Sequence, residues 1–198
     1  MPKVTGQYKS DLREKIIQAA IESFAQTGFD KTKMEDIAKR LGLSKGTIYL
    51  YFNSKEDLFL AICEHYVKVM RDQQHSAIFS KKEDLVLDSE HFYENFRRLE
   101  QGKDRVMLEM VVESSRNSRL KKGMYEHRLK VYDAVVEHLN RQIEKGFIKK
   151  GIDVNGLASA FVALYDGLTV SKMLGISEAS NKKAWAAMVR AVMEGIGG

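Results

Sequence analysis

The chain has 198 residues, of which 44% are hydrophobic and 30% are charged, and its formal net charge is +5. This composition excludes a collagen-like or wholly disordered chain, and a protein of this length can fold without a disulfide or metal. The single cysteine cannot form an intramolecular bridge, the N-terminal residues lack the apolar core of a secretory signal, and charged residues interrupt the longest apolar run. We therefore expect a cytoplasmic protein without a membrane span.

The spacing of apolar residues indicates an all-α fold. Proline occurs only at position 2, and apolar residues recur every three or four positions along most of the chain. We expect a flexible arm over residues 1–9 and then a helix from Ser10 that ends near Gly28. A domain boundary is expected in the charged, irregular segment 77–88. The sequence predicts about nine helices in total, the later ones at about 89–101, 104–115, 120–146, 153–174 and 181–195.

Residues 32–58 contain three helix starts close together. Thr32, Ser44 and Ser54 can each cap a first turn with a side-chain oxygen, and the glutamate three residues after Thr32 has capping-box spacing. Gly42 allows a tight turn between the first two helices. Two short helices joined in this way are typical of a helix-turn-helix motif, whose second helix enters the major groove of DNA.

The second helix of this motif is expected over residues 45–52, with Ile48 and Phe52 facing the core. Gly46 would let the duplex approach closely, and hydroxyl and ammonium groups nearby can contact phosphates or base edges. The alternative is that these residues do not bind DNA, with the two tyrosines half-buried in the core and the lysines solvated. The candidate residues for binding double-stranded DNA are Lys33, Ser44, Lys45, Gly46, Thr47, Tyr49, Tyr51 and Lys55.

The segment SKGTIYLYFNSKEDL, from Ser44 to Leu58, closely resembles the signature of TetR-type transcriptional regulators, and the preceding FAQTGFDKTKMEDIAKRLGL extends the resemblance. The resemblance implies a small N-terminal domain of three helices that binds DNA, and a larger C-terminal helical domain that dimerises and holds an inducer. It also implies DNA contact by Thr47, Tyr49, Tyr51 and Lys55. Lys33 departs from the small hydroxyl residue usual at that position, which leaves Thr32 as the expected cap.

Small residues recur every four positions in the last two expected helices, a spacing that lets another helix approach closely. We expect these helices to form a homodimer interface, although packing within one chain is an alternative. The candidate interface residues are Ser159, Ala163, Gly167, Ser171, Ala184, Ala187 and Ala191.

Methionines and aromatic residues of the C-terminal half can line an adaptable ligand cavity, or can simply form core. The candidate pocket residues are Phe92, Phe96, Met107, Met110, Met124, Tyr125, Phe161 and Tyr165. Glu109 and Glu113 lie one turn apart and would favour a cationic ligand if either faced the cavity. We therefore expect an apolar or cationic small-molecule inducer.

We interpret the chain as a ligand-responsive repressor that binds a palindromic operator as a homodimer, with no cofactor or metal. Residues 1–54 would bind DNA, helix 55–76 would connect the domains, and residues 77–198 would bind the ligand and dimerise. An activator and a ligand-independent DNA-binding protein are alternatives with the same fold. A helical-bundle enzyme is a distant one, because the sequence has no phosphate-binding, zinc or nucleophile motif.

Overall fold

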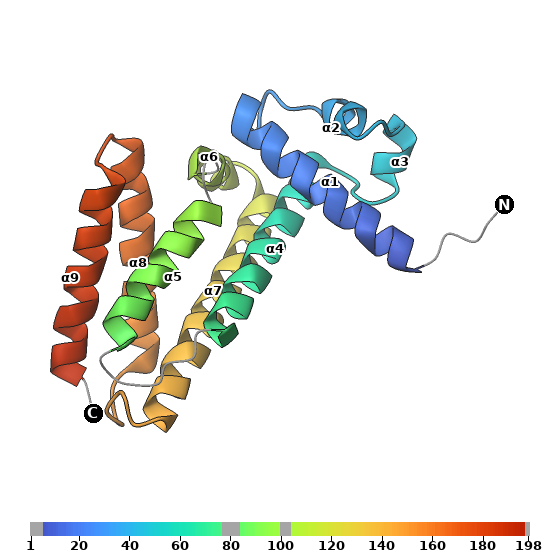
Figure 1. The fold of residues 1–198 in the computed structure, drawn as a ribbon. Coiled ribbons are helices and arrows are strands. Elements are labelled where there is room, and N and C mark those ends of the chain that lie inside the picture. The colour runs from blue at the N-terminus through green and yellow to red at the C-terminus, as the bar shows by residue number, and fades with distance from the viewer. Residues whose placement is uncertain (1–5, 77–83, 100–103, 197–198) are drawn as a thin grey trace. The chain divides into compact units, whose positions relative to one another are not determined.

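The computed structural model describes residues 6–76, 84–99 and 104–196, and Figure 1 shows their helices. The side chains of residues 73–76, 84–88, 92, 96 and 99 lie outside this description. The described ranges contain no strand, and they confirm the predicted all-α fold and its nine helices. None of these helices is both long and apolar enough to cross a bilayer. The helices are α1 (Gly6–Thr27), α2 (Met34–Arg40), α3 (Lys45–Tyr49), α4 (Lys55–Ser76), α5 (Asp84–Leu99), α6 (Asp104–Ser114), α7 (Ser118–Glu144), α8 (Val154–Met173) and α9 (Glu178–Ile196).

Most helix ends lie within a few residues of the prediction, and α4 has the predicted bounds. Two helices start at least four residues earlier than expected. α1 begins at Gly6, so residues 6–9 of the expected arm are helical, and α5 begins at Asp84, inside the segment that we expected to be irregular. α3 is shorter than predicted, although hydrogen bonds to the carbonyl of Ile48 continue its last turn to Phe52.

The predicted caps of α3 and α4 are confirmed, whereas the cap of α2 is not. The hydroxyl oxygens of Ser44 and Ser54 accept hydrogen bonds from backbone N–H groups three residues later, both at 3.1 Å. The predicted cap Thr32 is wrong, because its buried hydroxyl donates to the carbonyl of Gly28 at 2.7 Å and so closes the end of α1. The N-cap of α2 is Lys33, whose N–H donates to the Asp36 carboxylate at 3.1 Å.

Packing divides the described residues into two units, which differ from the functional division predicted from the sequence. The first unit comprises residues 6–66 and 104–127, so α6 and the start of α7 pack with the N-terminal helices. Its core joins Phe24 of α1, Ile48 of α3 and Phe59 of α4 to Met110 of α6. Cys63 lies in the same core, where burial raises the pKa of its thiol, as expected for a packing residue.

The second unit contains residues 67–76 and 84–99 with residues 128–196. Within it α9 packs against both α5 and α8, as Figure 1 shows. Its aromatic cluster centres on Trp185, whose ring stacks on that of Tyr93 with the centroids 5.5 Å apart. The Trp185 indole N–H donates to the carbonyl of Ser89 at 2.9 Å, which fixes α9 to α5.

Candidate nucleic-acid interface

The helices α1, α2 and α3 form a compact support for the candidate interface. Ile37 of α2 and Ile48 of α3 are fully buried in the core of the first unit. Gly42 has a φ of +65°, and this left-handed turn redirects the chain between the two helices. The apolar sides of α2 and α3 are therefore fixed inward, which leaves the opposite side of α3 accessible.

The predicted residues at the start of α3 lie together and are accessible. Ser44, Lys45 and Gly46 are exposed, and Thr47 is half-buried with its hydroxyl 2.8 Å from that of Ser44. A Cβ atom added to Gly46 would lie 3.8 Å from the Ser44 hydroxyl oxygen and would meet nothing closer. The fold itself therefore leaves room for a side chain at Gly46. Packing within the chain does not explain the glycine, whereas the close approach of another molecule would.

Lys45 forms an ion pair that the sequence analysis missed. Its Nζ atom lies 2.5 Å from the Oε1 atom of Glu35 on α2. This hydrogen bond lowers the pKa of Glu35 and raises that of Lys45, so both groups stay charged at neutral pH. The ten-residue separation of the two side chains gives no local signal in the sequence. A phosphate that approaches Lys45 would therefore compete with this carboxylate for the ammonium group.

The two tyrosines of the motif differ in their surroundings. Tyr49 is exposed, whereas the half-buried Tyr51 packs against the core of the first unit. The structure therefore places Tyr49 on the open side and gives Tyr51 a packing contact as well. Leu50 between them is 84% exposed, and the sequence analysis did not single it out. A helical wheel of the predicted helix 45–52 would have indicated it, because Leu50 lies opposite Ile48.

Along the chain, Lys33 at the start of α2 and Lys55 at the start of α4 lie on either side of α3, the expected recognition helix. The Lys55 ammonium donates to the carbonyls of Phe29 and Asp30 at 2.6 and 3.1 Å. Burial lowers the pKa of Lys55, and its Nζ atom lies 4.3 Å from the centroid of the Phe29 ring. Lys55 thus already holds the loop after α1, and a phosphate would have to compete with these carbonyls. Lys33 is exposed at the start of α2.

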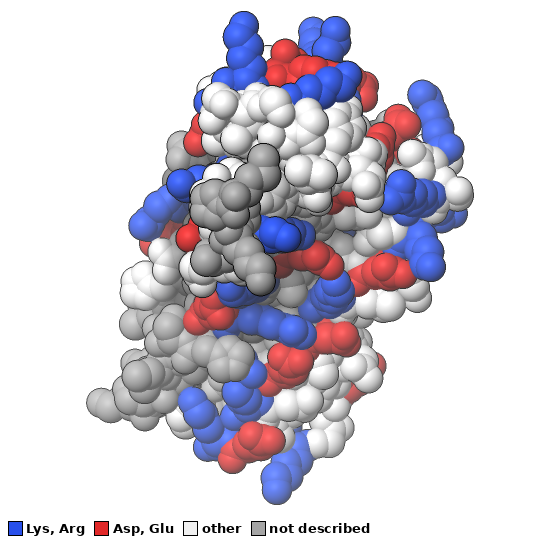
Figure 2. Space-filling model, turned by 90° about the vertical axis from the view of Figure 1, so that its right-hand side faces the viewer, with Lys and Arg blue, Asp and Glu red and all other residues white. Residues whose placement is uncertain are grey.

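Charges of both signs are interspersed on the face of the molecule shown in Figure 2. This agrees with the modest net charge of +5. A uniformly basic surface would bind any duplex strongly, since phosphate contacts carry no sequence information. The face shown is therefore not a uniformly basic surface.

The candidate pocket residues are distributed over both units. Met110 is fully buried in the first core, where Met107 and Met124 pack against it, and Tyr125 is exposed on α7. Phe161 and Tyr165 belong to the aromatic cluster of the second unit. The side chains of Phe92 and Phe96 lie outside the described residues.

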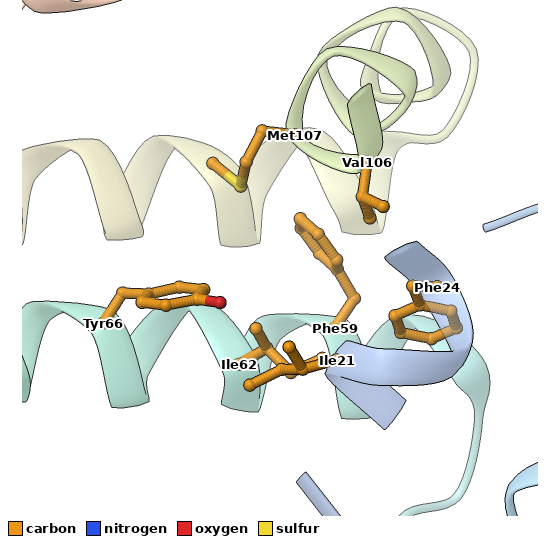
Figure 3. A pocket seen from close by; sticks show the side chains of 7 residues that line it. All are labelled: Ile21, Phe24, Phe59, Ile62, Tyr66, Val106 and Met107. Atoms are coloured by element: carbon orange, nitrogen blue, oxygen red, sulfur yellow. The ribbon is translucent and has the colours of Figure 1, made fainter. Parts of the chain in front are cut away.

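Met107 also lines a small apolar cavity in the first unit. Figure 3 shows Val106 and Met107 of α6 facing side chains of α1 and α4 across it. Its volume is about 20 Å³, which is room for about one water molecule and far less than a typical ligand pocket. The cavity is lined by Ile21, Phe24, Phe59, Ile62, Tyr66, Val106 and Met107.

Glu109 makes a contact that we did not foresee. One of its carboxylate oxygens accepts the N–H of Phe29 at 2.9 Å, and the other lies 2.7 Å from Nε of Arg105. Glu109 is therefore engaged with the end of α1, and a cationic ligand would have to displace Arg105 from it. Through this contact α6 is hydrogen-bonded to the loop that Lys55 also holds.

The candidate dimer residues lie on the accessible sides of α8 and α9. Ser171 is half-buried, and the other six are exposed: Ser159, Ala163, Gly167, Ala184, Ala187 and Ala191. A Cβ atom added to Gly167 would meet no atom within 4 Å. Packing within this chain therefore gives no reason for a residue without a side chain at that position.

Comparison with known proteins agrees with this geometry. Residues 16–62 match the model of bacterial regulatory proteins of the tetR family, and residues 90–197 match that of the C-terminal part of BetI-type transcriptional repressors. The HTH-type regulator YfiR of Bacillus subtilis is 29% identical over 150 residues, which cover 73% of this chain and 70% of YfiR. The repressor AcnR of Corynebacterium diphtheriae is 26% identical over 182 residues, covering 91% of this chain and 90% of AcnR.

A solved structure shows the same fold over nearly the whole chain. A TetR-family regulator from Rhodococcus sp. superposes with a TM-score of 0.80 at 18% identity, covering 93% of this chain and 99% of the other. The second family model alone spans more than half of the 198 residues. Together with the helix-turn-helix in the first unit, these matches show that the chain belongs to the tetR family of DNA-binding transcriptional regulators.

Proposed function

We propose that this regulator is a ligand-responsive repressor that binds a palindromic operator as a homodimer and is released by a small-molecule inducer. Residues 1–54 read the DNA, α4 connects, and residues 77–198 bind the inducer and dimerise. Such a repressor acts in the cytoplasm, where its operator lies. The C-terminal match to BetI-type repressors and the name of AcnR support repression over activation.

The observation that carries the proposal is the accessible row of small residues on α8 and α9, which we call the seam. It comprises Ser159, Ala163, Gly167, Ser171, Ala184, Ala187 and Ala191. A glycine inside a helix costs about 1 kcal/mol relative to alanine, yet Gly167 has open space around it. The end of α8 also exposes apolar side chains, including Val170, Met173 and Leu174. A second copy of the chain would cover this surface, and a two-fold axis would then present two recognition helices to a palindrome.

The DNA-reading surface proposed here is the open side of α3 with its neighbours. Lys45, Gly46, Thr47 and Tyr49 belong to this surface, and Ser44 orients the first turn through its cap. Lys33, Tyr51 and Lys55 lie at its edges and contact phosphates. Each protomer places this surface in one major groove, with the two half-sites about 34–36 Å apart.

The inducer proposed here is an apolar or cationic molecule that prefers the conformation unable to bind DNA. The half-buried, adaptable side chains of Met107 on α6 and Met124 on α7 support an apolar ligand. The aromatic rings of Phe161 and Tyr165 support either class, since aromatic faces attract cations. Binding would shift α4 and thereby the spacing of the two recognition helices.

The experiment that tests the proposal is selection of bound duplexes from a random DNA pool, with the mass of the protein measured by sedimentation. We expect a palindrome to be enriched by a dimer. Its affinity should fall when an inducer from an apolar and cationic compound library is added. Enrichment of a non-palindromic site by a monomer would contradict the homodimer. If expression of a reporter gene next to the selected operator rises when the protein is present, the result would favour an activator.

A further inference from the structure

Leu50 is the most exposed large apolar side chain in the described part of the chain, at 84%. It directly follows α3 and keeps right-handed helical angles, with φ −71° and ψ −19°. Its N–H donates to the carbonyl of Thr47 at 3.2 Å, so the helical turn continues through it. Leu50 therefore continues the recognition helix by one residue beyond the bounds of α3.

Helix geometry places Leu50 opposite the buried side of the recognition helix. At about 100° per residue, Leu50 and Gly46 each lie two residues and therefore about 160° from the fully buried Ile48, on either side of the direction opposite to it. Gly46 has no side chain, so Leu50 is the side chain at the centre of this outer face. Thr47 and Tyr49 lie on its two flanks.

The other large aliphatic residues of α1, α2 and α3 behave differently from Leu50. Ile16, Ile17, Ile21, Ile37 and Ile48 are buried in the core of the first unit, and the half-buried Leu12 packs against that core. Leu50 instead keeps its apolar surface in water, on the side that a duplex would cover. Covering that surface releases the water around it, so the leucine gains most from an apolar partner.

The major groove offers one apolar group on the edges of its bases, the 5-methyl group of thymine. Leucine cannot donate or accept a hydrogen bond, so it cannot read the other groups on these edges or bind a phosphate. We propose that Leu50 reads a thymine in each operator half-site by contact with its 5-methyl group. This inference rests on the proposed operator binding and adds a determinant of base preference to it.

The test removes the methyl group from the DNA and the side chain from the protein, separately and together. An operator is first selected with the unmodified protein and then synthesised with deoxyuridine in place of every thymidine. This change removes the methyl groups and keeps all base pairs. The unmodified protein and Leu50→Ala are titrated with both duplexes at one salt concentration, because affinity for DNA varies steeply with salt.

We expect the unmodified protein to lose about fourfold in affinity per half-site on the deoxyuridine duplex, as burial of one methyl group predicts. Leu50→Ala should bind both duplexes equally. Val112→Ala, which shortens an exposed apolar side chain on α6, is the matched control and should respond like the unmodified protein. Since Leu50 is exposed, its truncation should leave the thermal unfolding curve unchanged.

Two results would overturn the inference while leaving operator binding intact. A similar loss in Leu50→Ala would show that another group senses the methyls, and no loss in the unmodified protein would show that none is read. Failure to select any duplex is a different result, because it would contradict the proposed operator binding itself.

Discussion

Gly46 is the residue at which the fold and the function make different demands. A side chain there would meet only the Ser44 hydroxyl at 3.8 Å, so the isolated protein has no steric need for glycine. Alanine forms helix better than glycine by about 1 kcal/mol. The glycine therefore persists at a cost to helix stability, which a close approach to DNA would explain.

We predict that Gly46→Ala leaves the protein equally or slightly more stable and weakens operator binding by tenfold or more, because its Cβ atom would hold the helix away from the duplex. Thermal unfolding followed by circular dichroism and titration of a labelled operator measure the two effects. Unchanged affinity with raised stability would show that the duplex does not come close to this position.

The ion pair of Lys45 with Glu35 gives a second prediction at this scale. We expect Glu35→Gln to leave stability unchanged, because exposed ion pairs contribute little. The freed Lys45 should strengthen binding to non-specific DNA and steepen the dependence of affinity on salt by about one unit per protomer.

The control for this prediction is Glu137→Gln. It removes the same charge from an exposed pair with Arg71 in the second unit. An equal effect of both variants would assign the change to net charge and not to Lys45. Salt titrations of both variants on a duplex without an operator distinguish the two outcomes.

At the scale of whole elements, α6 is joined to α1 by the core and to the loop after α1 by a polar contact. The Glu109 carboxylate accepts the Phe29 N–H at 2.9 Å, while Met110 beside it is fully buried. We predict that Glu109→Ala lowers the free energy of unfolding by about 1–3 kcal/mol, since it leaves this N–H without its acceptor. Urea denaturation measures the change.

Glu109→Gln should retain most of this stability, because the amide oxygen can still accept the Phe29 N–H. Glu113→Ala removes a carboxylate one turn further along α6 and controls for the loss of charge. If Glu113→Ala proved as destabilising as Glu109→Ala, the effect would belong to the charge of α6 and not to the contact with α1.

A feature of these elements can be predicted from the sequence when the residues that produce it lie a few positions apart. The caps at Ser44 and Ser54 and the extent of α4 were predictable, because they follow from residues a few positions apart. The role of Thr32 was not predictable from the spacing. Its hydroxyl could cap the start of α2 or bond to the end of α1, and in the structure it donates to the carbonyl of Gly28.

Contacts between distant segments gave the sequence analysis no signal. Nothing in the periodicity of α6 shows that Met110 would pack with Phe24 and Phe59, or that Glu109 would reach Phe29. The candidate DNA-binding residues follow from one short motif, so local sequence is enough to nominate them, and their contact with DNA stays a prediction. The candidate pocket, which draws on several helices, stays a prediction.

At the scale of the whole molecule, the proposed homodimer rests on the exposed small residues of α8 and α9. We predict that Ala163→Glu keeps the helical content of the protein, because the side chain at this exposed position would point into water in a single chain. It should convert the dimer into a monomer, since a carboxylate without a partner would be buried between the two copies.

Sedimentation velocity measures the mass, and affinity for the palindrome should fall together with the dimer. Lys121→Glu, at an exposed position on α7, introduces the same side chain away from the seam and should remain dimeric. A dimeric Ala163→Glu protein would place the interface on another surface.

The discontinuous first unit has a consequence for any attempt to transplant its DNA specificity. The chain leaves this unit within α4 and returns to it at α6, and Val106, Met110 and Leu120 complete a core that the N-terminal helices only begin. A fragment cut after Tyr66 would include the whole helix-turn-helix but would expose part of that core to water. A chimaeric regulator built from this protein must therefore take α6 and the start of α7 along with the motif, as two separate segments of sequence.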